Sequence, residues 1–153
     1  MTTPARPAEA PLTRSEIRYL QVLRLGRLAT IRPDGSVQIN PVMVYYNPAT
    51  ATIDIGGANM ASSRKFRNII VDPRVSVVVD DMVAAGVRCL EIRGHAEALR
   101  DPVDSAARAE GPIIRIHPAR VISFGVDSSD QMSRYRRVAD SGDAKPLHEG
   151  NNR

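Results

Sequence analysis

The segment with the most specific chemistry lies in the middle of the chain and reads GGANMASSRK, Gly56–Lys65. It follows a β-like run, Ala51–Ile55, and leads into a helix-like run, Phe66–Val71. Backbone N–H groups at the start of a helix have no partner within the helix, and the helix dipole favours negative charge there. A strand, a glycine break, two hydroxyls, two cations and a helix in this order therefore predict a binding site for an anion such as phosphate.

Four side chains of this segment could take part. Ser62 or Ser63 can cap the helix or donate a hydrogen bond to a phosphate. Arg64 can hold a phosphate with its planar guanidinium group, and Lys65 can add a point charge. The alternative is an ordinary capped surface helix with two solvated cations.

Groups that could catalyse a reaction by themselves are scarce. His95, His117 and His148 lie far apart in the sequence, without HxxxH spacing or a CxxC partner, so we predict no metal site. There is no GxSxG motif, and the adjacent carboxylates Asp80 and Asp81 are more typical of a loop cap than of an acid–base pair. We assign no catalytic residue. If the protein is an enzyme, a cofactor supplies the chemistry and the protein binds and orients it.

Length and composition indicate one domain with a sizeable core. The chain has 153 residues, of which 42% are hydrophobic. It contains no run of 18 apolar residues and no apolar stretch near its start, so we expect neither a membrane span nor a secretory signal. Cys89 is the single cysteine, which excludes an internal disulfide and fits a reducing cytoplasm. We therefore expect a cytoplasmic protein.

The charge balance favours an anionic ligand. The net charge is +4 and the pI is about 9.7. A nucleic-acid binder would draw on this charge and on the cluster Arg134–Arg137, but aromatic residues make up only 4% of the chain and tryptophan is absent, so stacking platforms for bases are few. A small, multiply charged ligand suits the sequence at least as well, and we expect no nucleic-acid partner.

The apolar patterns predict short strands interrupted by helices. Thr13 and Glu16 have the spacing of a capping box before the first helix. Pro41 interrupts a strand pattern, which predicts an edge, a bulge or an opening of the ladder. The predicted helices are Arg14–Leu23, Phe66–Val71, Asp101–Glu110 and Ser128–Val138. The predicted strands are Gly26–Ile31, Val37–Tyr46, Thr52–Ile55, Val75–Val79, Arg88–Leu99, and Ile113–Ile116 with Val121–Gly125 as a pair or one interrupted strand.

These elements predict an α+β fold with a mainly antiparallel sheet, because turns of hairpin type join most of the strands. We expect a disordered tail over residues 1–11, one barrel domain over residues 12–126, and a polar C-terminal tail over residues 127–153 that can contain the short helix. Asp80–Gly86 is predicted to be a loop.

At this point the sequence resembles the pyridoxamine-phosphate-oxidase-like superfamily of flavin- and deazaflavin-dependent split β-barrels. The resembling segments are LGRLATIRPDGSVQINPVMVYYNPATATIDIGG, ASSRKFRNIIVDPRVSVVVDD, LEIRGHAEAL and IIRIHPARVISFG. They cover about Ile17–Val126. The order Ser63-Arg64-Lys65, Asp72-Pro73-Arg74-Val75 and Arg93-Gly94 carries the resemblance, which is greatest to the branch that uses coenzyme F420.

The resemblance implies a split-barrel homodimer with two cofactors at the subunit interface. It implies that Arg64 and Lys65 hold the cofactor phosphate with Ser62 and Ser63 nearby. The residues that it places beside the ring system or along the stem of the cofactor are Gln38, Asn40, Pro41, Val42, Ile55 and Gly56.

The activity implied is that of an F420-dependent reductase, which transfers a hydride to an electron-poor C=C or C=O bond of a small organic substrate. Some relatives in this branch act late in antibiotic biosynthesis, on tetracycline-type polyketides. Pyridoxine chemistry is not implied, because residues 40–46 lack the cations of true pyridoxamine-phosphate oxidases. The alternatives are an FMN-dependent reductase or oxidase of the same fold and a non-catalytic carrier of F420, flavin or a heme-like ligand.

Two details of the site stay open at this stage. The product proton could come from solvent, from Tyr45 or Tyr46, or from His95. We expect the substrate to enter over the exposed face of the ring, beside Asp81–Val87.

Overall fold

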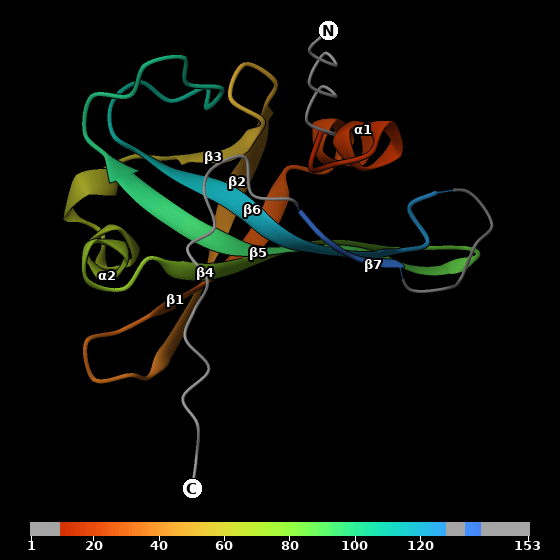
Figure 1. The fold of residues 1–153 in the computed structure, drawn as a ribbon, viewed down its shortest axis with the longest axis horizontal. Coiled ribbons are helices and arrows are strands. Elements are labelled where there is room, and N and C mark those ends of the chain that lie inside the picture. Colours follow the sequence, from red (N-terminus) through yellow and green to blue (C-terminus); the bar gives the residue numbers. More distant parts are fainter. Residues whose placement is uncertain (1–9, 128–133, 139–153) are drawn as a thin grey trace, which may run out of the picture.

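In the part of the chain that the structure describes, six antiparallel strands close into a barrel and a seventh extends the sheet. The computed structural model describes residues 10–127 and 134–138. The strand order is β3-β2-β1-β4-β5-β6-β7, and β3 also pairs with β6, which closes the ring (Figure 1). The strands are β1 (Leu25–Ile31), β2 (Val37–Asn47), β3 (Thr52–Gly56), β4 (Arg74–Val83), β5 (Gly86–Leu99), β6 (Ile113–Phe124) and β7 (Arg134–Arg137). The predicted α+β, mainly antiparallel split barrel is confirmed.

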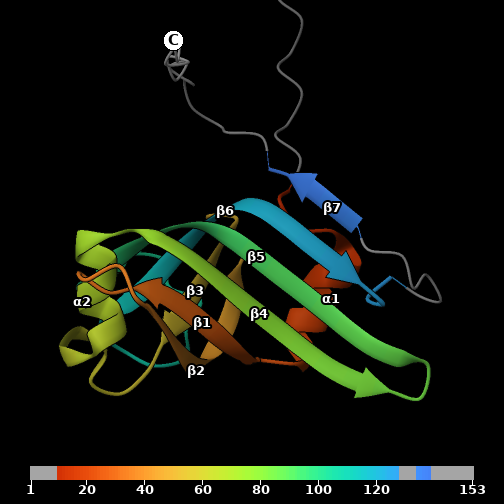
Figure 2. The ribbon, with the colours of Figure 1, turned by 90° about the horizontal axis from the view of Figure 1, so that it is seen from below.

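The two α-helices found among the described residues lie at opposite ends of the barrel (Figure 2). Helix α1 (Arg14–Val22) begins at the predicted capping box, in which the side chain of Thr13 accepts from the N–H of Glu16 and that of Glu16 accepts from the N–H of Thr13. Helix α2 (Arg64–Val71) follows a 3-10 turn, η1 (Met60–Ser62), and begins two residues earlier than predicted. Its apolar side is anchored by Phe66, which is completely buried against the sheet.

Alternating strand residues fill the barrel. Val77 and Val79 of β4 lie opposite Ile92 and Leu90 of β5, and all four are about 1% exposed. Each such side chain contributes roughly 1.5–3 kcal/mol when it leaves water, so this face fixes the register of the strands.

The segment Asp80–Gly86 is not the predicted loop. Strands β4 and β5 continue to the pair Val83↔Gly86 and form a long hairpin that projects away from the α2 end of the barrel (Figure 2). The reason is a contact across the two strands, where Arg88 donates to Asp81 at 2.5 and 2.9 Å, supported from helix α1 by the hydroxyl of Tyr19, which donates to the same carboxylate at 2.9 Å. Paired charges of this kind stabilise a ladder that a polar sequence alone does not predict.

The predicted helix Asp101–Glu110 is also wrong. Residues 100–112 form a loop without helix, because buried side chains from the barrel hold its backbone in turns. Arg115 donates to the carbonyls of Val103 and Asp104, while Asp54 accepts from the N–H of Ala106.

The described part of the predicted helix Ser128–Val138 is a strand. Residues 134–137 form β7, which pairs with β6 from Ser123 to Arg120, because β6 offers an open edge there. The guanidinium group of Arg136 binds the carbonyl of Pro11 and the buried carboxylate of Glu16. The predicted tails at residues 1–9 and 139–153 lie outside the described residues, and Pro11 itself is buried.

The last predicted strand pair is one strand, β6, with an irregularity opposite Arg93 and Gly94 of β5. A Cβ atom on Gly94 would lie 2.0 Å from the carbonyl oxygen of His117. The absence of a side chain at Gly94 therefore allows the two backbones to approach here.

Candidate functional site: a groove where the barrel opens

Strands β2 and β3 separate at the pair Met43↔Gly56, and a groove opens beyond it. Strand β2 continues to Val37 paired with β1 only, so residues 37–42 have no partner on the β3 side. The chain instead leaves Gly56 through Gly57 and Ala58 towards η1 and α2. The sequence predicted an edge, a bulge or an opening of the ladder at Pro41, and the structure has the opening. A proline suits this position because it has no N–H to leave unpaired.

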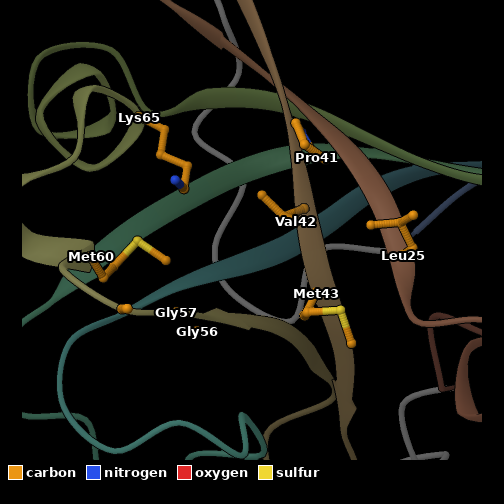
Figure 3. A pocket seen from close by; sticks show the side chains of 9 residues that line it. Leu25, Pro41, Val42, Met43, Gly56, Gly57, Met60 and Lys65 are labelled. Carbon is orange, nitrogen blue, oxygen red and sulfur yellow. The ribbon is translucent and has the colours of Figure 1, made fainter.

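The groove has a volume of about 230 Å³ and is mostly apolar. Figure 3 shows Val42, Met60 and Lys65 pointing into the same space, with Pro41, Met43 and Leu25 along its other side. The residues that line it are Leu25, Pro41, Val42, Met43, Gly56, Gly57, Ala58, Met60 and Lys65. An apolar cleft with one or two convergent polar groups is the usual form of a small-molecule site.

The one charged side chain in this lining is Lys65. It is half-buried, and its ammonium group has no hydrogen-bond or ion-pair partner within residues 10–127 and 134–138. An ammonium group that is partly removed from water gains most from an anion nearby. The arrangement therefore favours a ligand that combines an apolar surface with a negative charge.

The start of α2 lies beside this cation. Ser63 is the N-cap: its hydroxyl oxygen accepts from the N–H of Phe66 at 3.3 Å, and its hydroxyl donates to the carbonyl of Met60 at 2.6 Å. The first intrahelical bond runs from the N–H of Arg67 to Ser63, so the N–H groups of Arg64 and Lys65 precede the helical ladder and remain available to an anion.

A family model described as pyridoxamine 5'-phosphate oxidase matches residues 15–139 of the chain. A curated relative, the 5a,11a-dehydrotetracycline/5a,11a-dehydrooxytetracycline reductase of Streptomyces rimosus, is 38% identical over 123 residues, which cover 76% of this chain and 85% of the relative. The chain belongs to the pyridoxamine 5'-phosphate oxidase family. The resemblance found in the sequence is thereby confirmed.

Solved structures of low sequence identity share the fold of this family member. The FAD binding protein of Mycobacterium smegmatis matches with a TM-score of 0.57 and 21% identity, covering 82% of this chain and 97% of the other. A heme binding protein of Mycobacterium smegmatis matches with a TM-score of 0.58 and 16% identity, covering 89% of this chain and 60% of the other. At such identities these matches establish the fold alone.

In this member of the family, four of the ten predicted site residues line the groove. They are Pro41, Val42, Gly56 and Lys65. Gln38 and Asn40 lie on the same strand and are half-buried, joined to each other by a hydrogen bond of 3.0 Å. Their contact with a ligand stays a prediction.

The other four predicted residues are not part of the lining. Ile55 is completely buried in the barrel. Arg64 is exposed, and the hydroxyls of Ser62 and Ser63 donate to backbone carbonyls of η1 and the residue before it. Of the two roles predicted for Ser63, the structure has the helix cap. A role of these residues in binding stays a prediction.

Five lining residues were not named as site residues, although three of them belong to the segment Gly56–Lys65 in which the sequence predicts an anion site. The five are Leu25, Met43, Gly57, Ala58 and Met60. Met43 could have been found, because it continues the alternation of Pro41 along β2 and pairs with Gly56. Leu25 could not have been found from the sequence, since it lies beside the groove only because β1 pairs with β2 and puts Leu25 opposite Met43.

One wall of the groove is supported from behind by the loop of residues 100–112. A Cβ atom on Gly56 would lie 2.8 Å from the Cβ of Ala107. Burial raises the pKa of Asp54, but hydrogen bonds from Arg115, Ala106 and Asn47 outweigh it and hold the pKa below its ordinary value. Asp54 is therefore a charged anchor for the loop at neutral pH.

The candidate proton donors lie elsewhere. Tyr45, Tyr46 and His95 are not among the lining residues, and the hairpin tip at 81–87 projects from the end of the barrel away from α2 (Figure 2). Residues 81–87 therefore do not line the groove of a single protomer, and their predicted position beside the substrate's entry stays a prediction. Among the described residues, no group of His, Cys, Asp and Glu side chains is arranged to hold a metal ion, and no helix has the length and apolar character needed to span a membrane.

Proposed function

We propose that this protein is an oxidoreductase that binds coenzyme F420 in the groove and reduces an electron-poor C=C or C=O bond of a small organic substrate. The observation that carries the proposal is the half-buried Lys65 at the mouth of an apolar groove, where its ammonium group has no partner in the part of the chain that the structure describes. Membership of the family supports a cofactor of the flavin or deazaflavin type. The tetracycline-type substrate and a role in antibiotic biosynthesis are suggested by the Streptomyces relative.

The residues present fit such a cofactor. A planar ring system can lie against Pro41, Val42 and Met43, while the phosphate of its stem meets Lys65 and the N–H groups that begin α2. When bound, the cofactor supplies the hydride. Arg64 is exposed on the same turn and can add a second cation to the phosphate.

The protein's own contribution is to orient and to exclude water. The apolar walls and the rigid β2 strand fix the position of a bound ring relative to the substrate. Among the described residues that line the groove, Lys65 alone has a side chain that readily exchanges a proton, and we assign it to the phosphate. The product proton is therefore expected to come from solvent or from a group that reaches the groove only in an assembly.

A homodimer is part of the proposal. The outer face of β1 and β2 carries large apolar side chains that water reaches: Leu25 is 57% exposed, Val37 70%, Ile39 62% and Met43 42%. The pairs Leu25↔Met43, Ala29↔Ile39 and Ile31↔Val37 place them on one face. A second copy over this face would cover the apolar surface and enlarge the groove, which at about 230 Å³ is below the 300–1,000 Å³ of typical ligand sites.

The test is a titration of the purified protein with F420 and, separately, with FMN. We expect F420 to bind more tightly, and Lys65→Ala to weaken that binding by roughly one to two orders of magnitude, because hydrogen bonds to charged groups contribute about 1.5–3 kcal/mol. Arg67→Ala, on the exposed side of the same helix, is the matched control and should leave affinity nearly unchanged. Unaltered affinity in Lys65→Ala would contradict the proposal.

Two alternatives use the same groove. FMN carries the same kind of phosphorylated stem, so tighter binding of FMN and a flavin absorption spectrum of the purified protein would indicate a flavin reductase or oxidase. The absence of proton-exchanging side chains other than Lys65 in the lining also suits a carrier. Tight cofactor binding without turnover over a panel of enones and quinones would identify that role.

A further inference from the structure

A row of four polar side chains joins helix α2 to strands β1 and β2. The amide nitrogen of Asn68 donates to the hydroxyl of Thr30 at 3.0 Å and to the amide oxygen of Gln38 at 3.2 Å. The amide nitrogen of Gln38 donates to the amide oxygen of Asn40 at 3.0 Å. Asn68 and Thr30 are about 1% exposed, whereas Gln38 and Asn40 are half-buried. The row therefore begins in the core and ends near the surface of β2.

The row has a direction. Asn68 uses both hydrogens of its amide, so Gln38 turns its oxygen towards α2 and its nitrogen towards Asn40. The side-chain oxygen of Asn40 accepts this hydrogen bond from Gln38, and the side-chain nitrogen of Asn40, Nδ2, has no protein partner among the described residues. An amide nitrogen carries two donor hydrogens and no acceptor, so the end of the row presents donors.

The end of the row lies beside the groove. Asn40 precedes by two residues Val42, which lines the groove, and the alternation of a strand puts both on the same side of β2. Asn68 follows Lys65 by three residues, which places the two on neighbouring turns of one face of α2. Asn40 on β2 and Lys65 on α2 thus lie on the two elements that border this end of the groove, although Asn40 itself is not among the lining residues.

We infer that Asn68 is a positioning residue that orients the amides of Gln38 and Asn40, so that the groove offers N–H donors to a ring with a carbonyl or anionic nitrogen acceptor at its edge. The inference rests on the proposed function and deepens it. A ring that presents a donor at this edge would meet two hydrogens and be rejected. The residue that would set this preference for acceptors is Asn68, which is buried and does not line the groove.

The direction of the row can be reversed by one isosteric change. In Asn68→Asp the side chain can only accept, so Gln38 must donate to it and turn its oxygen towards Asn40. The amide nitrogen of Asn40 would then donate to Gln38, and the amide oxygen of Asn40 would be turned towards the groove. We expect binding of F420 and of FMN to weaken by about three- to tenfold and the visible absorption band of the bound ring to shift. Arg67→Gln changes the net charge of α2 by the same amount at the neighbouring exposed position. This control should neither weaken binding of the cofactor nor shift its absorption band.

A double-mutant cycle separates positioning from general destabilisation. Because Asn68 acts through Asn40, Asn68→Asp should add no further loss of affinity in an Asn40→Ala background. Additive losses, or an unchanged affinity and spectrum in Asn68→Asp, would overturn the inference. If circular dichroism shows that Asn68→Asp does not fold, the same cycle is measured with Gln38→Glu, in which residue 38 can only accept, so that Asn40 must turn a hydrogen towards it and the same loss of affinity is expected.

The failure of the inference is distinguishable from that of the proposed function. Wild-type protein that binds neither F420 nor FMN overturns both. Wild-type protein that binds one of them, together with an Asn68→Asp variant that binds it equally well, overturns the positioning role alone.

Discussion

Asp54 of β3 and Arg115 of β6 form a buried ion pair, with Nε of Arg115 2.8 Å from Oδ1 of Asp54. The side chain of Asp54 is inaccessible to solvent and that of Arg115 is 9% exposed. The pair sits where β3 and β6 close the barrel, at the register Asp54↔Arg115. It also binds the backbone of the loop that supports Gly56, so barrel closure and the shape of the groove depend on the same two charges.

Removing one partner of this pair should destabilise the protein strongly. We expect Asp54→Ala to lower the free energy of unfolding by about 3–5 kcal/mol, because it leaves the guanidinium group of Arg115 buried without its counter-ion. Urea denaturation followed by circular dichroism measures the change. The exposed pair Arg27–Asp80, at 2.6 Å, is the control, and Asp80→Ala should change stability by less than about 1 kcal/mol. Equal effects of the two variants would contradict the role of burial.

Stability should fall at acid pH through Asp54 and Glu16. Burial raises the pKa of each, but hydrogen bonds outweigh it, led by Arg115 for Asp54 and Arg136 for Glu16, so both pKa values lie below their ordinary range. For each carboxyl group, the folded state therefore binds fewer protons than the unfolded state at pH values between its folded and unfolded pKa. The free energy of unfolding rises with pH over that range. The contribution is present above the unfolded pKa values of about 4 and is lost as pH falls through the folded ones.

The measurement is the urea midpoint from pH 7 down to pH 3. Asp54→Asn and Glu16→Gln should start from a lower stability at pH 7 and lose less of it on acidification than the wild type. Asp80→Asn, at an exposed position, should keep the wild-type slope. A wild-type slope in all three variants would show that these two carboxylates do not govern the acid response.

The adjacent glycines 56 and 57 should respond differently to the same substitution. In Gly56→Ala the new methyl group would lie 2.8 Å from Cβ of Ala107, so we expect a loss of roughly 1–3 kcal/mol in stability. In Gly57→Ala the nearest atom is the terminal methyl of Met60 at 3.9 Å, and the variant should be neutral or slightly more stable. Thermal unfolding compares the two. Equal stability would mean that the loop is not packed against Gly56.

The apolar outer face of β1 and β2 should control self-association. We expect Ile39→Asp, at a position 62% exposed, to shift the protein towards the monomer in sedimentation equilibrium, because a charge would be buried in the interface. F420 binding should weaken with it, since the proposed site needs the second copy. Thr50→Asp, an exposed position outside this face, is the control. A wild-type protein that is monomeric at all concentrations would exclude the dimer.

The sequence by itself determined the local features of this protein. The capping box at Thr13 and Glu16 set the start of α1, and alternating apolar residues set most of the strands. The order of glycines, serines and cations after Ile55 indicated an anion site, which stays a prediction, and the structure places Gly56 and Lys65 of this segment in the lining of the groove. These signals are short-range, because capping, alternation and turn chemistry act over a few residues.

Only the tertiary structure decided the contacts between residues far apart in the chain. The loop of residues 100–112 is no helix because Asp54, which is 52 residues before Ala106, holds its backbone together with Arg115, which follows the loop on β6. Leu25 lies in the groove because it pairs with Met43, and the side chain of Asn68 reaches Gln38 because α2 packs against β1, the neighbour of β2 in the sheet. A local sequence pattern does not identify the partners of such side chains. Burial in the folded barrel strengthens their hydrogen bonds and ion pairs enough to override local propensity.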